Sequence, residues 1–181
     1  MKSLRVAIVG FGNIAYGYSL NKKYSQEQKY ASHTQAILAN KALRLDTVIS
    51  DDLSAALDAK DKLGISFACS SALDVPEKDT VDIIVFACPP DVNKIEIMDF
   101  FPNLKAVFLE KPISQSLEDS SLLQEYLNNR TIKSQVSFLR RGDKFLISLM
   151  NGGLHKLIGD PVNVHVTYGN GLMNNGSHMI D

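Results

Sequence analysis

A glycine-rich turn directly after a short apolar run limits the folds open to this chain. Residues 4–9 (LRVAIV) predict a buried strand, and residues 10–15 (GFGNIA) follow at once in the pattern GxGxxA. The first glycine of such a turn allows the sharp bend, the second lets the backbone approach a pyrophosphate, and the alanine lets a helix pack closely on the strand. The free N–H groups at the start of that helix would face the phosphates. A purely structural turn is the alternative interpretation.

The rest of the chain alternates short apolar runs with helical segments, which predicts a doubly wound parallel α/β sheet, a Rossmann domain over residues 1–139. A helix is expected to begin near Gly12, whereas the polar stretch 16–31 has weak apolar periodicity and is interpreted as an insertion or loop. Further strands are expected at 43–50, 65–69, 81–87, 105–109 and 134–139. Further helices are expected at 32–41, 51–63, 91–101 and 116–129.

The pattern changes after residue 139. A helix is expected at 140–150, a break at 151–153, a period-two strand at 162–168 and a helix from 174 to 181. Residues 140–181 are therefore interpreted as a crossover helix and the incomplete start of an α+β open-sheet domain for substrate binding and oligomerisation. Because one strand and one helix do not make a stable domain, we expect the chain to be a truncated form of a larger protein.

Composition excludes several classes of partner. The 181 residues carry a formal net charge of −1, so no basic excess is present to bind nucleic acid. No run approaches the roughly 18 apolar residues needed to span a membrane, and the N-terminal apolar run is too short for a signal peptide. Cys69 and Cys88 do not form a CxxC pair, and no His, Cys or carboxylate cluster predicts a metal site. These features predict a cytoplasmic protein in a reducing compartment.

Asp51 is the candidate ligand for the adenosine ribose. An acidic residue at the end of the second strand usually occupies this position, roughly 20 residues after the glycine turn. Asp51 lies 39 residues after Gly12, and the stretch 16–31 accounts for the excess. Its neighbour is Asp52 rather than an arginine, which favours NAD over NADP as the cofactor. Capping of the next helix is the alternative role, and the two aspartates could divide the two tasks.

Four segments together resemble the Gfo/Idh/MocA oxidoreductases, the family that includes glucose–fructose oxidoreductase and inositol dehydrogenase. They are GFGNIA at 10–15, ACPP at 87–90, LEKPIS at 109–114 and NNGSHMID at 174–181. The resemblance extends over essentially the whole chain. It implies a larger two-domain enzyme whose second domain is an open-faced sheet through which the full-length form makes homo-oligomers.

The resemblance also implies roles for individual residues. Lys111 would face the substrate, where a cation that donates a hydrogen bond stabilises a developing alkoxide. His178 would accept the hydroxyl proton, since its ordinary pKa lies near operating pH. The family commonly has an aspartate four residues before this histidine, whereas this chain has Asn174, which can orient the imidazole but cannot stabilise its cation with a charge. A solvated lysine and a structural histidine are the alternatives, and His33 is assigned to packing of its helix.

The predicted function is an NAD(P)-dependent oxidoreductase that transfers hydride between nicotinamide and a secondary hydroxyl of a sugar, sugar nucleotide or cyclitol. This chain alone is expected to be weakly active or inactive. The alternatives are a non-catalytic dinucleotide-binding regulator and an inactive remnant. The residues predicted to bind the cofactor are, from the turn and the second strand, Gly10, Phe11, Gly12, Asn13, Ile14 and Asp51. The resemblance adds Cys88, Pro89 and Pro90 beside the nicotinamide, Glu110 near its ribose, and Lys111.

Overall fold

The computed structural model describes residues 3–23, 30–163 and 165. The chain divides into two compact units, Met1–Val136 and Ser137–Asp181, each of which is described separately. The boundary lies just before the one expected between residues 139 and 140. The first unit contains the described strands and the glycine-rich turn.

The first unit is built on one sheet of six parallel strands. The strand order is β3-β2-β1-β4-β5-β6. After β3 at one edge of the sheet, the chain crosses back to form β4 on the other side of β1. This is the order of a doubly wound dinucleotide-binding sheet, and it confirms the predicted Rossmann fold. The strands are β1 Leu4–Val9, β2 Leu43–Ile49, β3 Phe67–Cys69, β4 Ile83–Phe86, β5 Ala106–Leu109 and β6 Lys133–Val136.

The six strands end in register along one edge of the sheet. Val9 pairs with Ile49 on one side and with Phe86 on the other. Phe86 in turn pairs with Leu109, and Ile49 pairs with Cys69. The residues that follow these strand ends therefore emerge side by side, which is where ligands bind in open α/β sheets.

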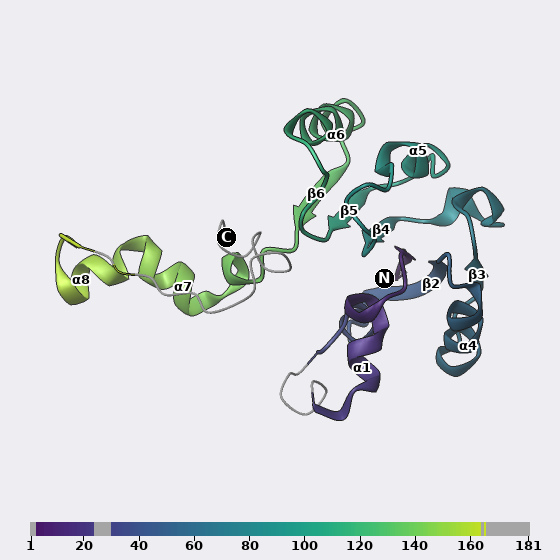
Figure 1. Ribbon diagram of the computed structural model, residues 1–181, viewed down its shortest axis with the longest axis horizontal. Helices are drawn as coiled ribbons and strands as arrows, with labels where there is room; N and C mark the ends of the chain where they lie inside the picture. The colour runs from purple at the N-terminus through teal and green to yellow at the C-terminus, as the bar shows by residue number, and fades with distance from the viewer. Residues whose placement is uncertain (1–2, 24–29, 164, 166–181) are drawn as a thin grey trace. The chain divides into compact units, whose positions relative to one another are not determined.

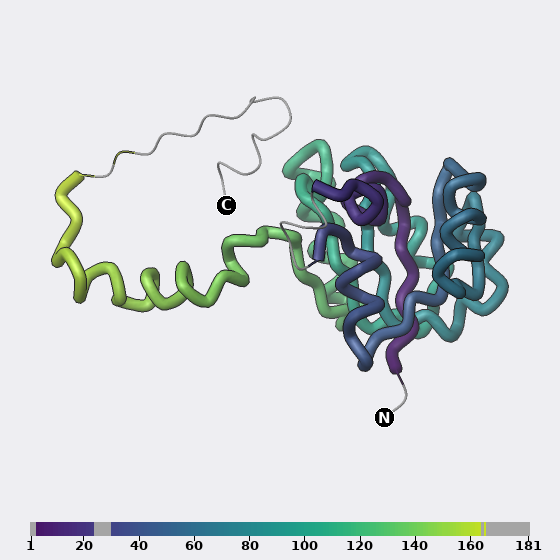
Figure 2. The backbone as a smooth tube through the Cα atoms, turned by 90° about the horizontal axis from the view of Figure 1, so that it is seen from below, coloured from purple at the N-terminus to yellow at the C-terminus, as the bar shows by residue number. Residues whose placement is uncertain are grey.

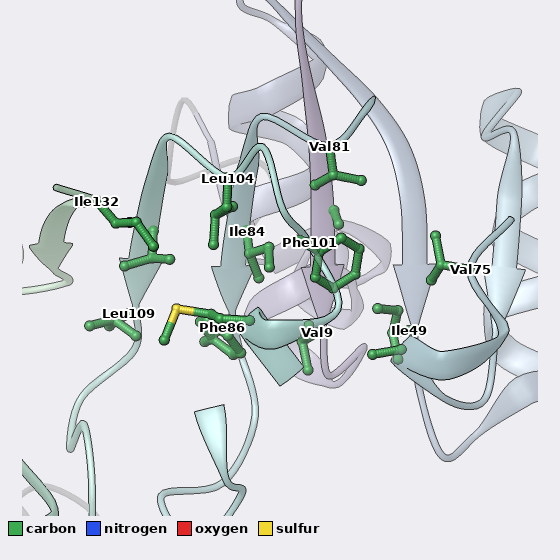
Figure 3. Packing of buried hydrophobic residues seen from close by; sticks show 14 of the residues in the cluster. Val9, Ile49, Val75, Val81, Ile84, Phe86, Phe101, Leu104, Leu109 and Ile132 are labelled. Carbon is green, nitrogen blue, oxygen red and sulfur yellow. The ribbon is translucent and has the colours of Figure 1, made fainter. Parts of the chain in front are cut away.

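Helices cover both faces of the sheet (Figure 1). The helices α5 (Lys94–Asp99) and α6 (Leu117–Asn129) lie on one face, where Met98 and Leu123 join a buried cluster with Phe86. Figure 3 shows Val9, Phe86 and Phe101 within this cluster. The opposite face carries α1 (Tyr18–Leu20), α3 (His33–Leu38) and α4 (Leu53–Leu63). Figure 2 looks onto this face, with the purple strand β1 seen between α3 and α4.

The pattern of two-sided burial follows from strand alternation. Along β1, Val6 and Ile8 pack toward the α3 and α4 face, whereas Ala7 and Val9 pack toward the α5 and α6 face. Side chains of a strand alternate between faces, so a strand covered on both sides must be apolar throughout. This explains the continuous apolar runs in the sequence.

A bulge in β2 places a carboxylate inside the sheet. The pairing of β1 with β2 shifts between Val6 and Ala7, which leaves Asp46 as the extra residue. Asp46 is fully buried; its Oδ2 lies 2.5 Å from Arg5 Nη2, and its Oδ1 accepts a hydrogen bond from Ser66 at 2.9 Å. Burial lowers the pKa of Arg5, but its hydrogen bonds to Asp46 and Glu77 and the attraction of their charges together leave that pKa raised. This buried ion pair was not anticipated from the sequence.

Replacing Asp46 with alanine is expected to lower the free energy of unfolding by about 3 kcal/mol, because the mostly buried Arg5 loses its buried partner and keeps only the half-exposed Glu77. Urea denaturation of the purified protein measures the change. Asp58→Ala is the matched control, since Asp58 forms a 2.6 Å pair with Lys62 in which both side chains are mostly exposed. The control should leave the midpoint unchanged. Equal midpoints for the two variants would contradict the stabilising role of the buried pair.

Several element boundaries differ from those predicted. The assignment of 16–31 to a loop was wrong for its first residues, because the helical turn Asn13–Gly17 continues directly into α1. The ring of Phe11 stacks on Tyr16 with 5.3 Å between centroids, which holds this turn against the glycine-rich bend. Helix α5 is shorter than the expected 91–101, because Asn93 caps it by accepting the Glu96 N–H.

The second unit begins with a short helical series. It comprises a 3₁₀ turn at Leu139–Gly142, α7 (Lys144–Ser148), a turn at Leu149–Gly153 and α8 (Leu154–Ile158). The expected break at 151–153 is present, since Asn151 and Gly152 leave helical geometry. The predicted helix at 174–181 and most of the predicted strand at 162–168 lie outside the described residues. Within the described residues, no helix combines the length and apolar character that crossing a membrane requires.

Candidate functional site

The glycine-rich turn connects β1 to the first helix at the C-terminal edge of the sheet. Gly10 has φ +83°, and a Cβ at this position would lie 2.5 Å from the carbonyl oxygen of Ala87. Only glycine fits there, because both the backbone angle and the close approach to β4 exclude a side chain. At Gly12, by contrast, a Cβ would meet no atom within 4 Å. The second glycine therefore borders open space, as a phosphate cradle requires.

The helical turn after Gly12 has no side-chain cap at its N-terminus. The neighbouring helices all have one: Ser32 caps α3, Asp52 caps α4 and Ser116 caps α6. Uncapped N–H groups at a helix start, together with the positive end of the helix dipole, form a site for an anion. Asn13–Gly17 and α1 thus present their first amides to the space beside Gly12.

A cleft of about 780 Å³ runs along this edge of the sheet. This volume is in the range of sites that bind cofactors. Of the residues predicted to bind the cofactor, the cleft is lined by Gly10, Phe11, Gly12, Asn13, Ile14, Asp51, Cys88 and Pro89. Pro90 lines a separate hollow, and neither Glu110 nor Lys111 is part of the cleft wall.

The two aspartates after β2 have separate positions. The side chain of Asp52 caps α4 by accepting the Ala55 N–H at 3.0 Å. Asp51 is exposed and lines the cleft, one residue beyond the buried Ser50. Asp52 thus caps the helix, and Asp51 is the aspartate that lines the cleft.

The segment after β4 forms the opposite wall. Cys88 lies half-buried in this wall, and burial raises the pKa of its thiol, which disfavours the nucleophilic thiolate. The buried ammonium group of Lys94 donates to the carbonyl oxygens of Pro90 and Val92, at 3.4 and 3.2 Å. Burial also lowers the pKa of Lys94. Lys94 thus fixes the loop between Cys88 and α5.

The start of α5 contributes cleft residues that sequence reasoning missed. Asn93 caps the start of α5, Glu96 and Ile97 lie within the helix, and Phe100 follows its last residue. An acidic and apolar helix face carries no recognisable motif, so only the packing of α5 beside the glycine-rich turn reveals their position.

Glu110 and Lys111 follow β5 at the same edge. The Glu110 N–H donates to the Phe86 carbonyl at 2.9 Å, so the sheet ladder continues one residue past the strand. His33 Nε2 lies 2.9 Å from Glu110 Oε1, and the Lys111 N–H donates to Glu110 Oε2 at 3.3 Å. The assignment of His33 to helix packing alone missed this contact.

His178 and Asn174 lie outside the described residues, so their predicted roles are unchanged by the structure. Within the described residues, no group of three His, Cys, Asp or Glu side chains is arranged to hold a metal ion.

The parallel sheet, the uncapped helix start beside Gly12 and the cleft lined by Asp51 are the arrangement of a dinucleotide-binding Rossmann fold. Comparison with known protein families identifies the family of the chain. Residues 4–138 match the Gfo/Idh/MocA family, described as an oxidoreductase family with an NAD-binding Rossmann fold. The chain belongs to this family, which confirms the resemblance; three of the four sequence segments lie within the matched residues, and the segment at 174–181 lies beyond them.

Individual relatives are similar over part of their length. Over 82 residues, 45% of this chain and 24% of the relative, the sequence is 30% identical to scyllo-inositol 2-dehydrogenase (NAD(+)) of Bacillus subtilis (strain 168). A structure of Lactobacillus casei scyllo-inositol dehydrogenase with bound NAD(H) and scyllo-inositol has a TM-score of 0.66 at 21% identity, covering 88% of this chain and 43% of that one.

The same fold occurs in a super-repressor mutant of Gal80p from Saccharomyces cerevisiae. Its TM-score is 0.64 at 21% identity, and the match covers 87% of this chain and 40% of that one. This chain therefore spans less than half the length of each of these three proteins.

Proposed function

We propose that this chain is the nucleotide-binding part of an NAD-dependent dehydrogenase that oxidises a secondary hydroxyl of a cyclitol or a related sugar. The observation that carries the proposal is the uncapped helix start beside Gly12, in a cleft that also contains Asp51. The family match supports an oxidoreductase, and the inositol dehydrogenase of B. subtilis supports a cyclitol as the substrate class.

Different residues of the cleft would bind different parts of the cofactor. The amides after Gly12 would hold the pyrophosphate, and the Asp51 carboxylate would accept hydrogen bonds from the adenosine ribose hydroxyls. Cys88 and Pro89 would border the nicotinamide, with Pro90 and Glu110 beside them. Bound NAD supplies the acceptor for the hydride that leaves the carbinol carbon.

The remaining roles fall to residues near the substrate. The Lys111 ammonium group would donate a hydrogen bond to the substrate hydroxyl oxygen, an interaction that strengthens as negative charge develops there. His178 would accept the hydroxyl proton, and Asn174 would orient its imidazole. Loss of the hydride from the carbinol carbon would leave a ketone, and the hydroxyl proton would remain on His178.

A second candidate is a regulator that binds the dinucleotide without turnover. The observation that favours it is Asn174, since an amide supplies no negative charge to stabilise a protonated His178. Both candidates require the cleft to bind a dinucleotide, and they differ only in the chemical step.

The test of cofactor binding is a fluorescence titration of the protein with NADH and with NADPH. We expect NADH to bind more tightly, because the Asp51 carboxylate would repel a 2′-phosphate. Asp51→Arg should reverse this preference by about tenfold, which corresponds to roughly 1.4 kcal/mol.

Asp52→Ala is the matched control for this titration. Loss of its cap should lower stability by about 1 kcal/mol without changing the preference between the two cofactors. Absence of binding for both dinucleotides would refute the proposed function in both forms. An unchanged preference in Asp51→Arg would refute only the assignment of Asp51.

A further inference from the structure

The contact between His33 and Glu110 joins two segments that are 77 residues apart in sequence. The two side chains are 15% and 12% exposed, so the pair is largely removed from water. The imidazole also meets the Phe108 ring edge-on, with 5.4 Å between centroids. Phe108 and Glu110 are two residues apart along β5 and its extension, and therefore point to the same face. His33 thus packs on one of these side chains and hydrogen-bonds the other.

His33 is held in place by the start of its own helix. It is the first residue of α3, directly after the capping residue Ser32. The Ser32 hydroxyl accepts the Gln35 N–H at 3.3 Å, and the Gln35 side chain accepts the Ala31 N–H at 2.7 Å. This reciprocal arrangement resembles a capping box and fixes the first turn. A second hydroxyl, that of Ser19, contacts Ser32.

The Glu110 carboxylate is held at both oxygens. Oε1 faces His33 Nε2, and Oε2 accepts the backbone N–H of Lys111. A carboxylate can only accept hydrogen bonds, so Nε2 of His33 must carry the hydrogen in this pair. The hydrogen bonds therefore run from the imidazole to the carboxylate and from the Lys111 amide to the same carboxylate. They tie the start of α3 to the residue that follows Glu110.

We propose that His33 is a positioning residue for Lys111: by orienting the Glu110 carboxylate, it fixes the backbone from which the Lys111 side chain extends. The role rests on the proposed function, because it matters for turnover only where Lys111 acts on the substrate. A histidine that served packing alone would need the ring against Phe108 and not the hydrogen bond. The two roles can therefore be separated by substitution.

Two substitutions of His33 separate packing against Phe108 from the hydrogen bond to Glu110. His33→Phe keeps an aromatic ring against Phe108 but cannot donate to Glu110, whereas His33→Gln keeps an N–H donor of similar reach without the ring. NMR of the 181-residue chain supplies a readout independent of turnover. We expect the His33 nitrogens to report hydrogen on Nε2 in the wild type. We also expect the amide proton of Lys111 to move upfield in His33→Phe and to stay in place in His33→Gln.

Turnover supplies the second readout, measured on the intact protein, that is, the dehydrogenase of which this chain is proposed to be the nucleotide-binding part. In His33→Phe we expect kcat to fall by about 10- to 100-fold with the NADH dissociation constant unchanged, because misplacement of a catalytic group penalises the chemical step. His33→Gln should restore kcat to within about twofold of the wild type. Equal kcat in both variants, whether intact or impaired, would overturn the positioning role, as would an unmoved Lys111 amide in His33→Phe.

Failure of the proposed function has a different signature. In that case the wild-type protein would bind neither dinucleotide or would show no turnover, whatever the His33 variants do. A positioning role that fails on its own would instead show Lys111→Ala impaired and His33→Phe at the wild-type rate.

Discussion

Gly12→Val is expected to raise the NADH dissociation constant at least roughly 100-fold while leaving the melting temperature unchanged. A Cβ at this position would meet no atom within 4 Å, so we expect the folded chain to tolerate a side chain there. The same space is where the proposed pyrophosphate would approach the uncapped amides after Gly12. Loss of two charge-assisted hydrogen bonds, at about 1.5 kcal/mol or more each, gives a change of this size. Fluorescence titration and thermal unfolding of the same samples measure both quantities.

Gly10→Ala is the matched contrast in the same turn. Its φ of +83° and the 2.5 Å approach of a Cβ to the Ala87 carbonyl oxygen place strain in the folded state. We expect a loss of about 2 kcal/mol or more in stability, together with weaker binding. If Gly12→Val bound NADH as tightly as the wild type, the space beside Gly12 would not be the pyrophosphate site.

Lys111→Ala is expected to lower kcat by about 100- to 1000-fold with NADH binding retained. Removal of one donor from a developing oxyanion costs a factor of this size. Lys111 follows Glu110 at the edge where β1, β4 and β5 end in register, although it is not part of the cleft wall. The measurement is the initial rate of NADH formation from scyllo-inositol and myo-inositol by the intact protein, alongside the NADH titration.

Lys105→Ala is the control, because Lys105 precedes the opposite end of the same strand. Its side chain is 63% exposed and pairs with Asp82 at 2.6 Å. We expect its turnover to match that of the wild type. A wild-type protein that binds NADH but shows no turnover would favour the regulator, and Lys111→Ala would then retain NADH binding. A parent enzyme unaffected by Lys111→Ala would contradict the catalytic role.

Much of the first unit could be predicted from local sequence. The apolar run of β1, the glycines at 10 and 12 and the strands before Cys88 and Glu110 each carry a short-range signal. The doubly wound parallel sheet could be predicted as a class, whereas the strand order β3-β2-β1-β4-β5-β6 came from the structure. The paired aspartates showed the limit of this reasoning. Their two tasks could be listed, but only backbone geometry assigned the cap to Asp52 and the cleft to Asp51.

Contacts between distant segments could not be predicted in this way. Asp46 gives no sign in the sequence of being buried with Arg5, because the bulge that accommodates it depends on how β1 pairs with β2. Lys94 would ordinarily be assigned to an exposed helix face, yet it is buried against the carbonyls of Pro90 and Val92.

The sequence by itself determined the class of fold and the place of the glycine-rich turn, because strand periodicity and turn residues are properties of adjacent positions. Only the tertiary structure decided which side chains meet across that edge. His33 contacts Glu110 because α3 begins beside β5, 77 residues away along the chain. Such contacts depend on how whole elements pack, and no pattern of neighbouring residues specifies them.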